Sequence, residues 1–233
     1  MSGSLTLAQL TGRELDHLVA CDRGHYLHPR AAHALEALRE RARSAGFDLA
    51  VASSFRSYER QLAIFNGKAS GERPVHNDSG ELVVMDQLTL DRQLAAILRF
   101  SALPGTSRHH WGTDLDVYDT AAVGDAYQVR LTPVEVAPGG VFDAFHCWLD
   151  ERMEAGESEG FFRPYNIDRG GVAPERWHLS YAPVSRQCAI PDADQLLALW
   201  RETGLLLLEE VESRLEQLLE RYVMIPGDWC PRV

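Results

Sequence analysis

The sequence predicts an α+β protein in which a small antiparallel sheet is flanked by helices. Hydrophobic residues make up 45% of the 233 residues and charged residues 24%, which is typical of a folded globular chain. Segments with helical periodicity and segments with alternating periodicity follow one another along the chain. They lack the regular strand–helix–strand repetition that builds a parallel sheet, and this irregular order indicates an antiparallel one.

Helical periodicity first appears over residues 28–46. Pro29 suits the first turn of a helix, apolar residues follow at helical spacing, and Gly46 ends the pattern. Ser57 is a candidate cap for a second helix that carries apolar residues up to Phe65. Further helices are expected over residues 91–101, 142–153, 192–203 and 205–222.

Alternation of apolar and polar residues predicts three strands, over residues 47–52, 113–118 and 175–181. Residues 66–80 are rich in glycine, proline, serine and asparagine, so this segment is expected to form a loop. We expect this loop to contribute to the selectivity of the site described below.

The character of the chain changes near residue 190, which predicts one domain over residues 1–189 and a C-terminal helical extension over residues 190–233. The last predicted helix carries an apolar stripe at three- and four-residue spacing. Its members are Leu208, Val211, Leu215, Leu218 and Tyr222. Two interpretations stay open: the stripe packs against the chain's own domain, or it forms the contact of a homodimer.

Charge and composition exclude several classes of function. With 23 basic and 34 acidic side chains the net charge is −11, which argues against a protein that coats nucleic acid or an anionic membrane. The first residues lack the pattern of a secretory signal, and no apolar run is long enough to span a membrane. The four cysteines lie far apart and form neither a zinc knuckle nor a disulfide framework. A cytoplasmic location is expected.

One candidate metal-binding segment contains His109 and Asp116. On a straight strand, seven steps of about 3.3 Å would separate them by more than ~20 Å and send them to opposite faces. Gly112 lies between them and supplies a bend that brings the two side chains together. Taken alone, the segment is equally well explained as a polar turn before a strand.

A second candidate segment contains Glu175 and His178. A histidine that binds zinc, with an acid close by to handle the proton of an activated water, is typical of zinc hydrolases. This short pattern is common by chance. Together, however, the two segments supply two histidines, one aspartate and one spare glutamate, which suits a catalytic zinc site with three protein ligands and an open fourth position.

Arg56 lies where a predicted strand enters a predicted helix. A guanidinium at such a junction suits a carboxylate or a developing oxyanion, because the helix N-terminus favours the same charge. The alternative is a surface arginine in an ordinary salt bridge.

Three motifs stand in series over roughly residues 25–185. They are S-x-x-R-S-x-x-x-Q at 53–61, S-x-H-x-x-G-x-x-x-D at 107–116, and E-x-W-H at 175–178. Together they resemble the VanY-type D-alanyl-D-alanine carboxypeptidase family of the LAS zinc peptidases. The matched residues are Ser53, Arg56, Ser57, Gln61, Ser107, His109, Gly112, Asp116, Glu175, Trp177 and His178.

The resemblance implies a zinc peptidase that acts on peptides derived from peptidoglycan. One zinc ion per chain would bind to His109, Asp116 and His178. Glu175 would act as the general base, and Arg56 would stabilise the oxyanion. Of the other matched positions, Ser53, Gln61, Ser107 and Trp177 are expected to contact substrate.

The same resemblance leaves several activities open. A D,D- or L,D-carboxypeptidase, a dipeptidase and a phage-type L-Ala-D-Glu endopeptidase look alike at the metal, and an inactive zinc-binding interaction module is a further alternative. Two residues depart from the family pattern. Asp114 replaces a small residue and lies near the metal or turns to solvent, and Arg176 replaces a proline, which would change the charge beside the cleft.

Overall fold

The computed structural model describes residues 4–226. Its main sheet has four antiparallel strands in the order β3-β4-β6-β5, which confirms the predicted α+β class. The strands are β3 (Leu49–Ser53), β4 (Asp114–Asp119), β5 (Phe161–Phe162) and β6 (His178–Tyr181). A separate two-stranded ribbon pairs β1 (Val19–Ala20) with β2 (Tyr26–Leu27).

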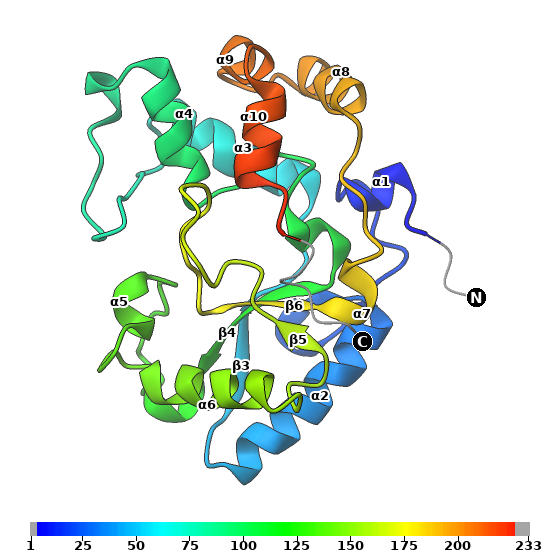
Figure 1. Ribbon diagram of the computed structural model, residues 1–233, viewed down its shortest axis with the longest axis vertical. Coiled ribbons are helices and arrows are strands. Elements are labelled where there is room, and N and C mark those ends of the chain that lie inside the picture. Colours follow the sequence, from blue (N-terminus) through cyan, green and yellow to red (C-terminus); the bar gives the residue numbers. More distant parts are fainter. Residues whose placement is uncertain (1–3, 227–233) are drawn as a thin grey trace.

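The two faces of the main sheet differ in chemistry because side chains alternate along each strand. On one face, Leu115, Val117 and Leu179 are buried in an apolar core between the sheet and the helices α2 (Pro29–Ser44) and α6 (Asp143–Glu154). In Figure 1 these two helices lie below the sheet. The opposite face of the same strands carries polar residues, and it positions the site.

A second apolar core lies above the sheet in Figure 1 and is built only from helices and loops. Its long helices are α3 (Tyr58–Ala69), α4 (Leu90–Leu98), α8 (Ala193–Thr203) and α10 (Leu215–Tyr222), with the short α9 (Leu208–Glu212) beside them. Trp200 of α8 is fully buried in this core, and its indole Nε1 donates a hydrogen bond to the carbonyl of Pro104 at 2.8 Å. The C-terminal helices therefore complete the core that α3 and α4 begin.

The apolar stripe near the C-terminus packs inside the chain. Val211, Leu215, Leu218 and Tyr222 are buried in the core shared with α3 and α4, and Leu208 is partly buried there. Of the two interpretations of the stripe, packing against the chain's own domain is therefore the one that the structure shows. A homodimer through the C-terminal helices would have to use another face, and it stays a prediction.

Several element boundaries differ from the sequence-based expectations; for example, the helix expected over 91–101 spans Leu90–Leu98. The helix expected over 205–222 is two helices, because the backbone of Arg214 leaves the helical region (φ −137°, ψ 22°) and lets both halves turn apolar residues into one core. The strand expected from Glu175 begins only at His178, because the amide of His178 donates to the carbonyl of Glu175 and closes a turn. Helix α3 continues to Ala69, into the segment expected to be a loop.

The remaining helices are short. The α-helical ones are α1 (Leu7–Leu10), α5 (Pro133–Val136) and α7 (Ala182–Ser185). The 3-10 turns are η1 (Asp22–Gly24), η2 (Met85–Gln87), η3 (Arg108–Trp111) and η4 (Thr120–Ala122). Of these, η3 positions a candidate ligand.

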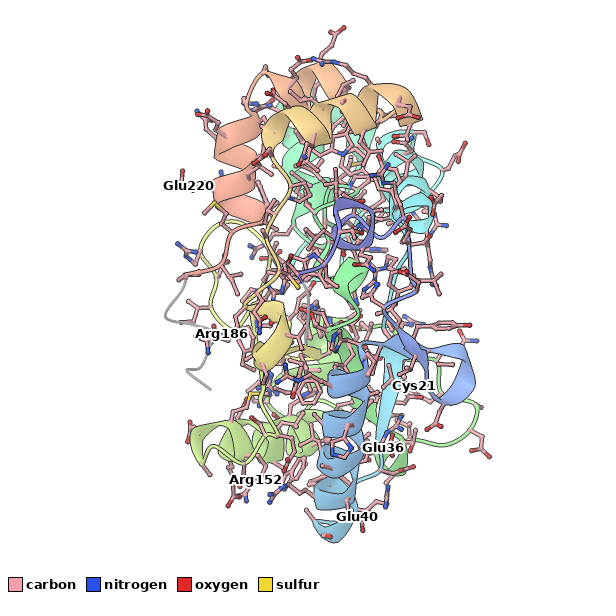
Figure 2. All side chains as sticks on the ribbon, turned by 90° about the vertical axis from the view of Figure 1, so that its right-hand side faces the viewer. Cys21, Glu36, Glu40, Arg152, Arg186 and Glu220 are labelled. Carbon is pink, nitrogen blue, oxygen red and sulfur yellow. The ribbon has the colours of Figure 1, made fainter. Side chains whose placement is uncertain are left out.

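The exterior is strongly charged. Figure 2 shows Glu36 and Glu40 pointing outward from α2 and Glu220 pointing outward from α10, and all three are exposed. Within residues 4–226, no helix is long and apolar enough to cross a membrane. Cys21, Cys147 and Cys188 are free thiols, and Cys230 lies outside the described residues.

Candidate metal centre and active site

The segment before β4 folds back as its sequence predicts. Residues Arg108–Trp111 form the 3-10 turn η3, and Gly112 then adopts a left-handed conformation (φ 67°) that redirects the chain into β4. A side chain at Gly112 would meet the side chain of Leu18 at 2.3 Å and the amide of His28 at 3.0 Å. The resulting bend places Nε2 of His109 3.5 Å from Oδ2 of Asp116.

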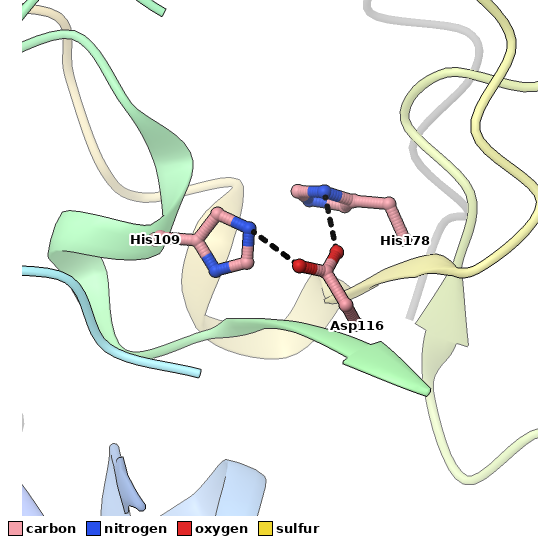
Figure 3. Close-up of side chains that lie close together, drawn as sticks. All are labelled: His109, Asp116 and His178. Carbon is pink, nitrogen blue, oxygen red and sulfur yellow. Dashed lines mark ion pairs between the residues drawn. The ribbon is translucent and has the colours of Figure 1, made fainter. Parts of the chain in front are cut away.

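Asp116 and His178 are brought together by strand register. They are direct partners across β4 and β6, so both side chains stand on the polar face of the sheet. Nδ1 of His178 lies 3.4 Å from Oδ1 of Asp116, and Figure 3 shows the Asp116 carboxylate between the two imidazole rings. One ligand atom from each of His109, Asp116 and His178 lies within 4.8 Å of the other two, and all three residues are buried.

Hydrogen bonds fix how each histidine ring faces this point. Nδ1 of His109 lies 2.9 Å from the carbonyl oxygen of Ser54 and donates to it, which leaves Nε2 with a free lone pair. Nε2 of His178 lies 3.0 Å from Oδ1 of Asp114 and donates to it, which leaves Nδ1 free. Both free nitrogens face Asp116. Two histidines oriented by outer acceptors, with one carboxylate, form the donor set of a catalytic zinc site, so the residues present fit this metal.

The charges around the two rings also fit a bound cation. Burial lowers the pKa of His109 to about 3, with a further lowering by Arg56, so this ring is neutral at physiological pH. His178 is buried too, but hydrogen bonds to Asp114, Asp116 and Glu175 raise its pKa. Three carboxylates around one imidazole attract either a proton or a metal ion, so a metal that bound here would displace the proton from Nδ1.

Asp114, whose role the sequence leaves open, lies behind His178 and not in solvent. Its side chain is fully buried. Besides His178, it accepts hydrogen bonds from Nε of Arg108 at 2.8 Å and from the hydroxyl of Thr113 at 2.6 Å. The Arg108 charge and these hydrogen bonds hold the pKa of Asp114 far below its usual range, against the effect of burial. An ionised Asp114 therefore fixes the orientation of His178.

Glu175 stands next to the three candidate ligands. The turn at residues 175–178 places Oε2 of Glu175 3.4 Å from Nδ1 of His178, and the side chain is only 12% exposed. Burial raises the pKa of Glu175, although His178 and Arg56 partly offset this effect. A carboxylate with a raised pKa beside a metal centre suits proton transfer near neutral pH.

Arg56 is held by two neutral side chains. Its Nη1 donates to Oε1 of Gln61 at 2.9 Å, and its Nη2 lies 3.3 Å from the hydroxyl oxygen of Ser53. Gln61 is fully buried and donates in turn to the carbonyl of Ala102 at 2.7 Å. Within residues 4–226 Arg56 has no ion-pair partner, unlike the ordinary surface arginine considered as an alternative. Its charge is therefore available to a ligand.

These groups line one cavity of about 600 Å³. Its wall contains the candidate ligands together with Arg56, Ser107, Glu175 and Trp177. Ser53 and Gln61 contact Arg56 but are not among the lining residues, so direct contact of these two with substrate stays a prediction. The predicted loop contributes Val75, His76, Asn77 and Gly80 to the wall.

Arg176 lies outside the cavity, which corrects the expectation that it changes the charge beside the cleft. Its guanidinium forms ion pairs with Asp143 at 2.9 Å and Asp150 at 2.7 Å, both on α6. It also donates to the carbonyl of Val136 at 2.6 Å. The physical reason is the turn before β6, in which Glu175 faces the cavity and its neighbour faces α6.

Neither periodicity nor a motif points to two further residues of the cavity wall. The ring of Tyr165 packs edge-on against His178, with the centroids 5.1 Å apart, but Tyr165 lies in an irregular segment without periodicity. Lys68 lies near the end of α3 and also lines the cavity. In the sequence, Lys68 is distinguished only by being the single lysine of the chain.

Comparison with known proteins identifies the family. A family model described as VanY, D-alanyl-D-alanine carboxypeptidase, matches residues 24–184, which is more than half of the chain. The chain belongs to this family. It is accordingly a metallopeptidase, and the matched range contains the candidate ligands, Glu175 and Arg56.

Relatives similar in sequence include an uncharacterised protein of Haemophilus influenzae. It is 44% identical over 103 residues, which cover 42% of this chain and 70% of that protein. The chain is also similar to the putative carboxypeptidase YodJ of Bacillus subtilis, with 25% identity over 177 residues. That match covers 74% of this chain and 52% of YodJ, so the chain spans about half the length of this relative.

Solved structures share the fold. A zinc-bound mutant of the D,D-pentapeptidase VanY from the VanB-type vancomycin-resistance cassette is 25% identical, with a TM-score of 0.51 over 85% of this chain and 90% of that one. The LD-carboxypeptidase LdcB is 21% identical, with a TM-score of 0.51 over 91% and 80% of the two chains. VanYB in complex with D-alanine-D-alanine is 23% identical, with a TM-score of 0.50 over 84% and 87%.

Proposed function

We propose that this chain is a zinc-dependent carboxypeptidase that removes the terminal D-amino acid from peptidoglycan stem peptides. One observation carries the proposal: His109, Asp116 and His178 converge at one point of a cavity that Glu175 and Arg56 also line. Membership of the VanY family supports it, as does the similarity to a zinc-bound D,D-pentapeptidase.

His109, Asp116 and His178 would hold a zinc ion at this point of the cavity. When bound, zinc would supply the Lewis acidity that makes water nucleophilic at neutral pH. His109 and His178 present their free nitrogens to it because Ser54 and Asp114 occupy the other nitrogen of each ring. This arrangement fixes the ligand geometry before substrate binds, which reduces the reorganisation that catalysis requires.

Glu175 moves the proton. Its carboxylate accepts a proton from the attacking water and returns it to the leaving amine of the D-amino acid. Burial and the raised pKa of Glu175 favour both steps, since the group must gain and lose a proton near neutral pH.

Arg56 faces the developing negative charge on the oxygen of the scissile carbonyl. Gln61 and Ser53 fix its guanidinium in place, and no acid of the described residues forms an ion pair with it. A preorganised cation in a cavity that excludes water stabilises a charge that appears only in the transition state.

We assign residues 1–189 to the catalytic domain and residues 190–233 to a helical extension that supports it. Two contacts of the extension favour this division of roles. Trp200 binds the carbonyl of Pro104, in the segment that leads to His109, and Tyr222 lines the cavity.

Mass spectrometry of zinc-loaded protein incubated with muropeptides tests the proposal. The substrates end in tetrapeptide or pentapeptide stems, and the Glu175→Gln variant is the control. Loss of one terminal alanine that is absent in the control is the expected result, and the stem consumed distinguishes D,D- from L,D-cleavage. Release of whole stem fragments would instead indicate an endopeptidase. No product from either stem, with the zinc site filled, would point to an inactive zinc-binding module.

A further inference from the structure

The chain contains a single lysine, Lys68, among 22 arginines. Every other permanently basic side chain is therefore a guanidinium. An ammonium is a compact point charge with three donors, whereas a guanidinium is a flat fork that binds bidentately, so the two are not interchangeable. The one ammonium in this chain lies in the wall of the candidate active site.

Lys68 and Arg56 are both tied by hydrogen bonds to the adjacent residues Ser101 and Ala102. Side chains on a helix lean toward its N-terminus, so Lys68, near the end of α3, reaches back toward Arg56, which precedes that helix. Nζ of Lys68 donates to the hydroxyl of Ser101 at 2.7 Å. The next residue, Ala102, accepts from Gln61, which in turn binds Arg56. The two cations thus share one wall of the cavity.

Neither cation forms an ion pair with a carboxylate of the described residues, although Asp116 and Glu175 lie near enough to act on Arg56 electrostatically. Within residues 4–226 no carboxylate forms an ion pair with Lys68, and Ser101 occupies one of its three donors. Burial and the charge of Arg56 lower the pKa of Lys68, while the charge of Glu175 raises it. Two unpaired cations held together in a partly desolvated cavity destabilise the protein unless an anion binds between them.

A carboxypeptidase substrate has two groups that can bind a cation, and they lie close together. The scissile carbonyl and the free carboxylate belong to neighbouring residues, whose Cα atoms lie about 3.8 Å apart. The carbonyl oxygen becomes negative only in the transition state, whereas the carboxylate is negative throughout. Arg56 and Lys68 supply one cation for each of these two groups in the same cavity, and Glu175 acts electrostatically on both cations.

We propose that Lys68 binds the free carboxylate at the C-terminus of the peptide, while Arg56 serves the scissile carbonyl. This inference rests on the proposed function and sharpens it, because a cation that requires a free terminal carboxylate makes the enzyme an exopeptidase. A peptide that continues past the scissile bond, or that ends in an amide, leaves the Lys68 ammonium unpaired and is cleaved poorly.

The decisive test compares two substrates that differ only at the end of the chain. One is a stem peptide with a free C-terminal carboxylate, and the other is the same peptide with a C-terminal amide. We expect the wild-type protein to favour the free acid by roughly 10- to 100-fold in kcat/KM, as for a charge-assisted hydrogen bond. Lys68→Met keeps the aliphatic stem and should lose most of this preference through a raised KM for the acid alone.

Arg60→Met is the matched control. Arg60 lies on the same helix and is exposed, so this variant removes one positive charge from α3 outside the cavity. It should keep the wild-type preference for the free acid. Lys68→Arg restores a charge with different geometry and should recover part of the preference.

Two results would overturn the proposal: a Lys68→Met variant that still prefers the acid, or one in which acid and amide substrates lose activity equally.

If the wild-type protein cleaves neither peptide, the proposed function fails, and a binding experiment then tests separately whether Lys68 binds a carboxylate. Because the chain has one lysine, [ε-13C]lysine labelling gives one NMR signal from a side-chain ammonium. In zinc-loaded protein D-alanine should shift this signal and D-alaninamide should not. No shift with D-alanine, or equal shifts with both, would contradict a carboxylate site at Lys68.

Discussion

Oδ1 of Asp114 lies 3.0 Å from Nε2 of His178, while Oδ1 of Asp116 lies 3.4 Å from Nδ1 of the same ring. The two aspartates are two residues apart on β4 and therefore share a face of the sheet. One carboxylate is a candidate metal ligand, and the other orients the histidine that completes the site. Asp114 can be ionised although it is fully buried, because it forms an ion pair with Arg108.

Replacing Asp114 should weaken zinc binding without removing a ligand. Asp114→Asn keeps the size of the side chain but provides a weaker acceptor for His178, so we expect zinc affinity to fall by roughly 10- to 100-fold. Competition with a chelator measures this affinity directly. Ser180→Ala is the control, because it removes a hydrogen bond to Asp114 and leaves the contact with His178. Wild-type affinity in Asp114→Asn would show that Asp114 does not act through His178.

Substitution of Glu175 should affect catalysis alone, whereas substitution of His178 should also affect metal binding. Glu175→Gln is expected to keep zinc and to lose roughly 10²- to 10⁴-fold in kcat, because the amide cannot accept the proton of the attacking water. His178→Ala removes a candidate ligand and should lose the metal itself. Metal content by atomic spectroscopy, measured beside turnover, distinguishes the two effects. A Glu175→Gln variant near the wild-type rate would remove Glu175 from the mechanism.

The candidate ligands could be predicted because their placement depends on local rules. The alternation in β4 and β6 sends Asp116 and His178 to one face, and Gly112 supplies the bend that returns His109 to them. Such information is contained in a few neighbouring residues. The class of fold follows from the same periodicities, since the alternating strands have one apolar face that helices must cover.

The partners of the candidate site residues could not be predicted, because they depend on distant parts of the chain. Arg176 follows Glu175 directly, but it pairs with α6 because the turn points it away from the cavity. Gln61 lies in a family motif, and only the packing of α3 against Ala102 shows that it holds Arg56. The break between α9 and α10 at Arg214 contains no glycine or proline, so the sequence does not indicate it.

Gln61 and Arg56 should behave as one unit in kinetics. Arg56→Ala removes the cation that stabilises the oxyanion, and we expect kcat to fall by roughly 10²- to 10³-fold. Gln61→Ala removes one of the two side-chain acceptors that hold the guanidinium, Ser53 being the other, and should lower kcat by a smaller factor. If Gln61 acts through Arg56, the double variant should be little worse than Arg56→Ala alone. Multiplicative effects of the two substitutions would instead indicate that Gln61 contacts substrate independently.

The free energy of unfolding should decrease as the pH is lowered, because His146 is buried in its neutral form. His146 lies on α6, far from the candidate ligands in sequence, and packs against Phe145. Its Nδ1 lies 3.3 Å from Nη2 of Arg163, and its Nε2 has no partner among the described residues. Burial, together with the charges of Arg163 and Arg176, lowers the pKa of His146 to about 2. The folded protein therefore keeps this ring neutral under conditions in which the unfolded chain takes up a proton.

The sign of the effect follows from this depressed pKa. The contribution of His146 is fully present above pH 6.5 and is lost as the pH falls from 6.5 toward 2, by up to about 1.4 kcal/mol per pH unit. His146→Asn keeps an acceptor for Arg163 but no longer titrates. The free energy of unfolding of both proteins can be measured with urea at pH 7.0 and at pH 4.5. Between these two pH values, the wild type should lose about 2 kcal/mol more of this free energy than the variant does. His33→Asn, which removes an exposed imidazole from α2, is the control. A parallel loss of stability in wild type and His146→Asn would mean that other groups govern the acid sensitivity.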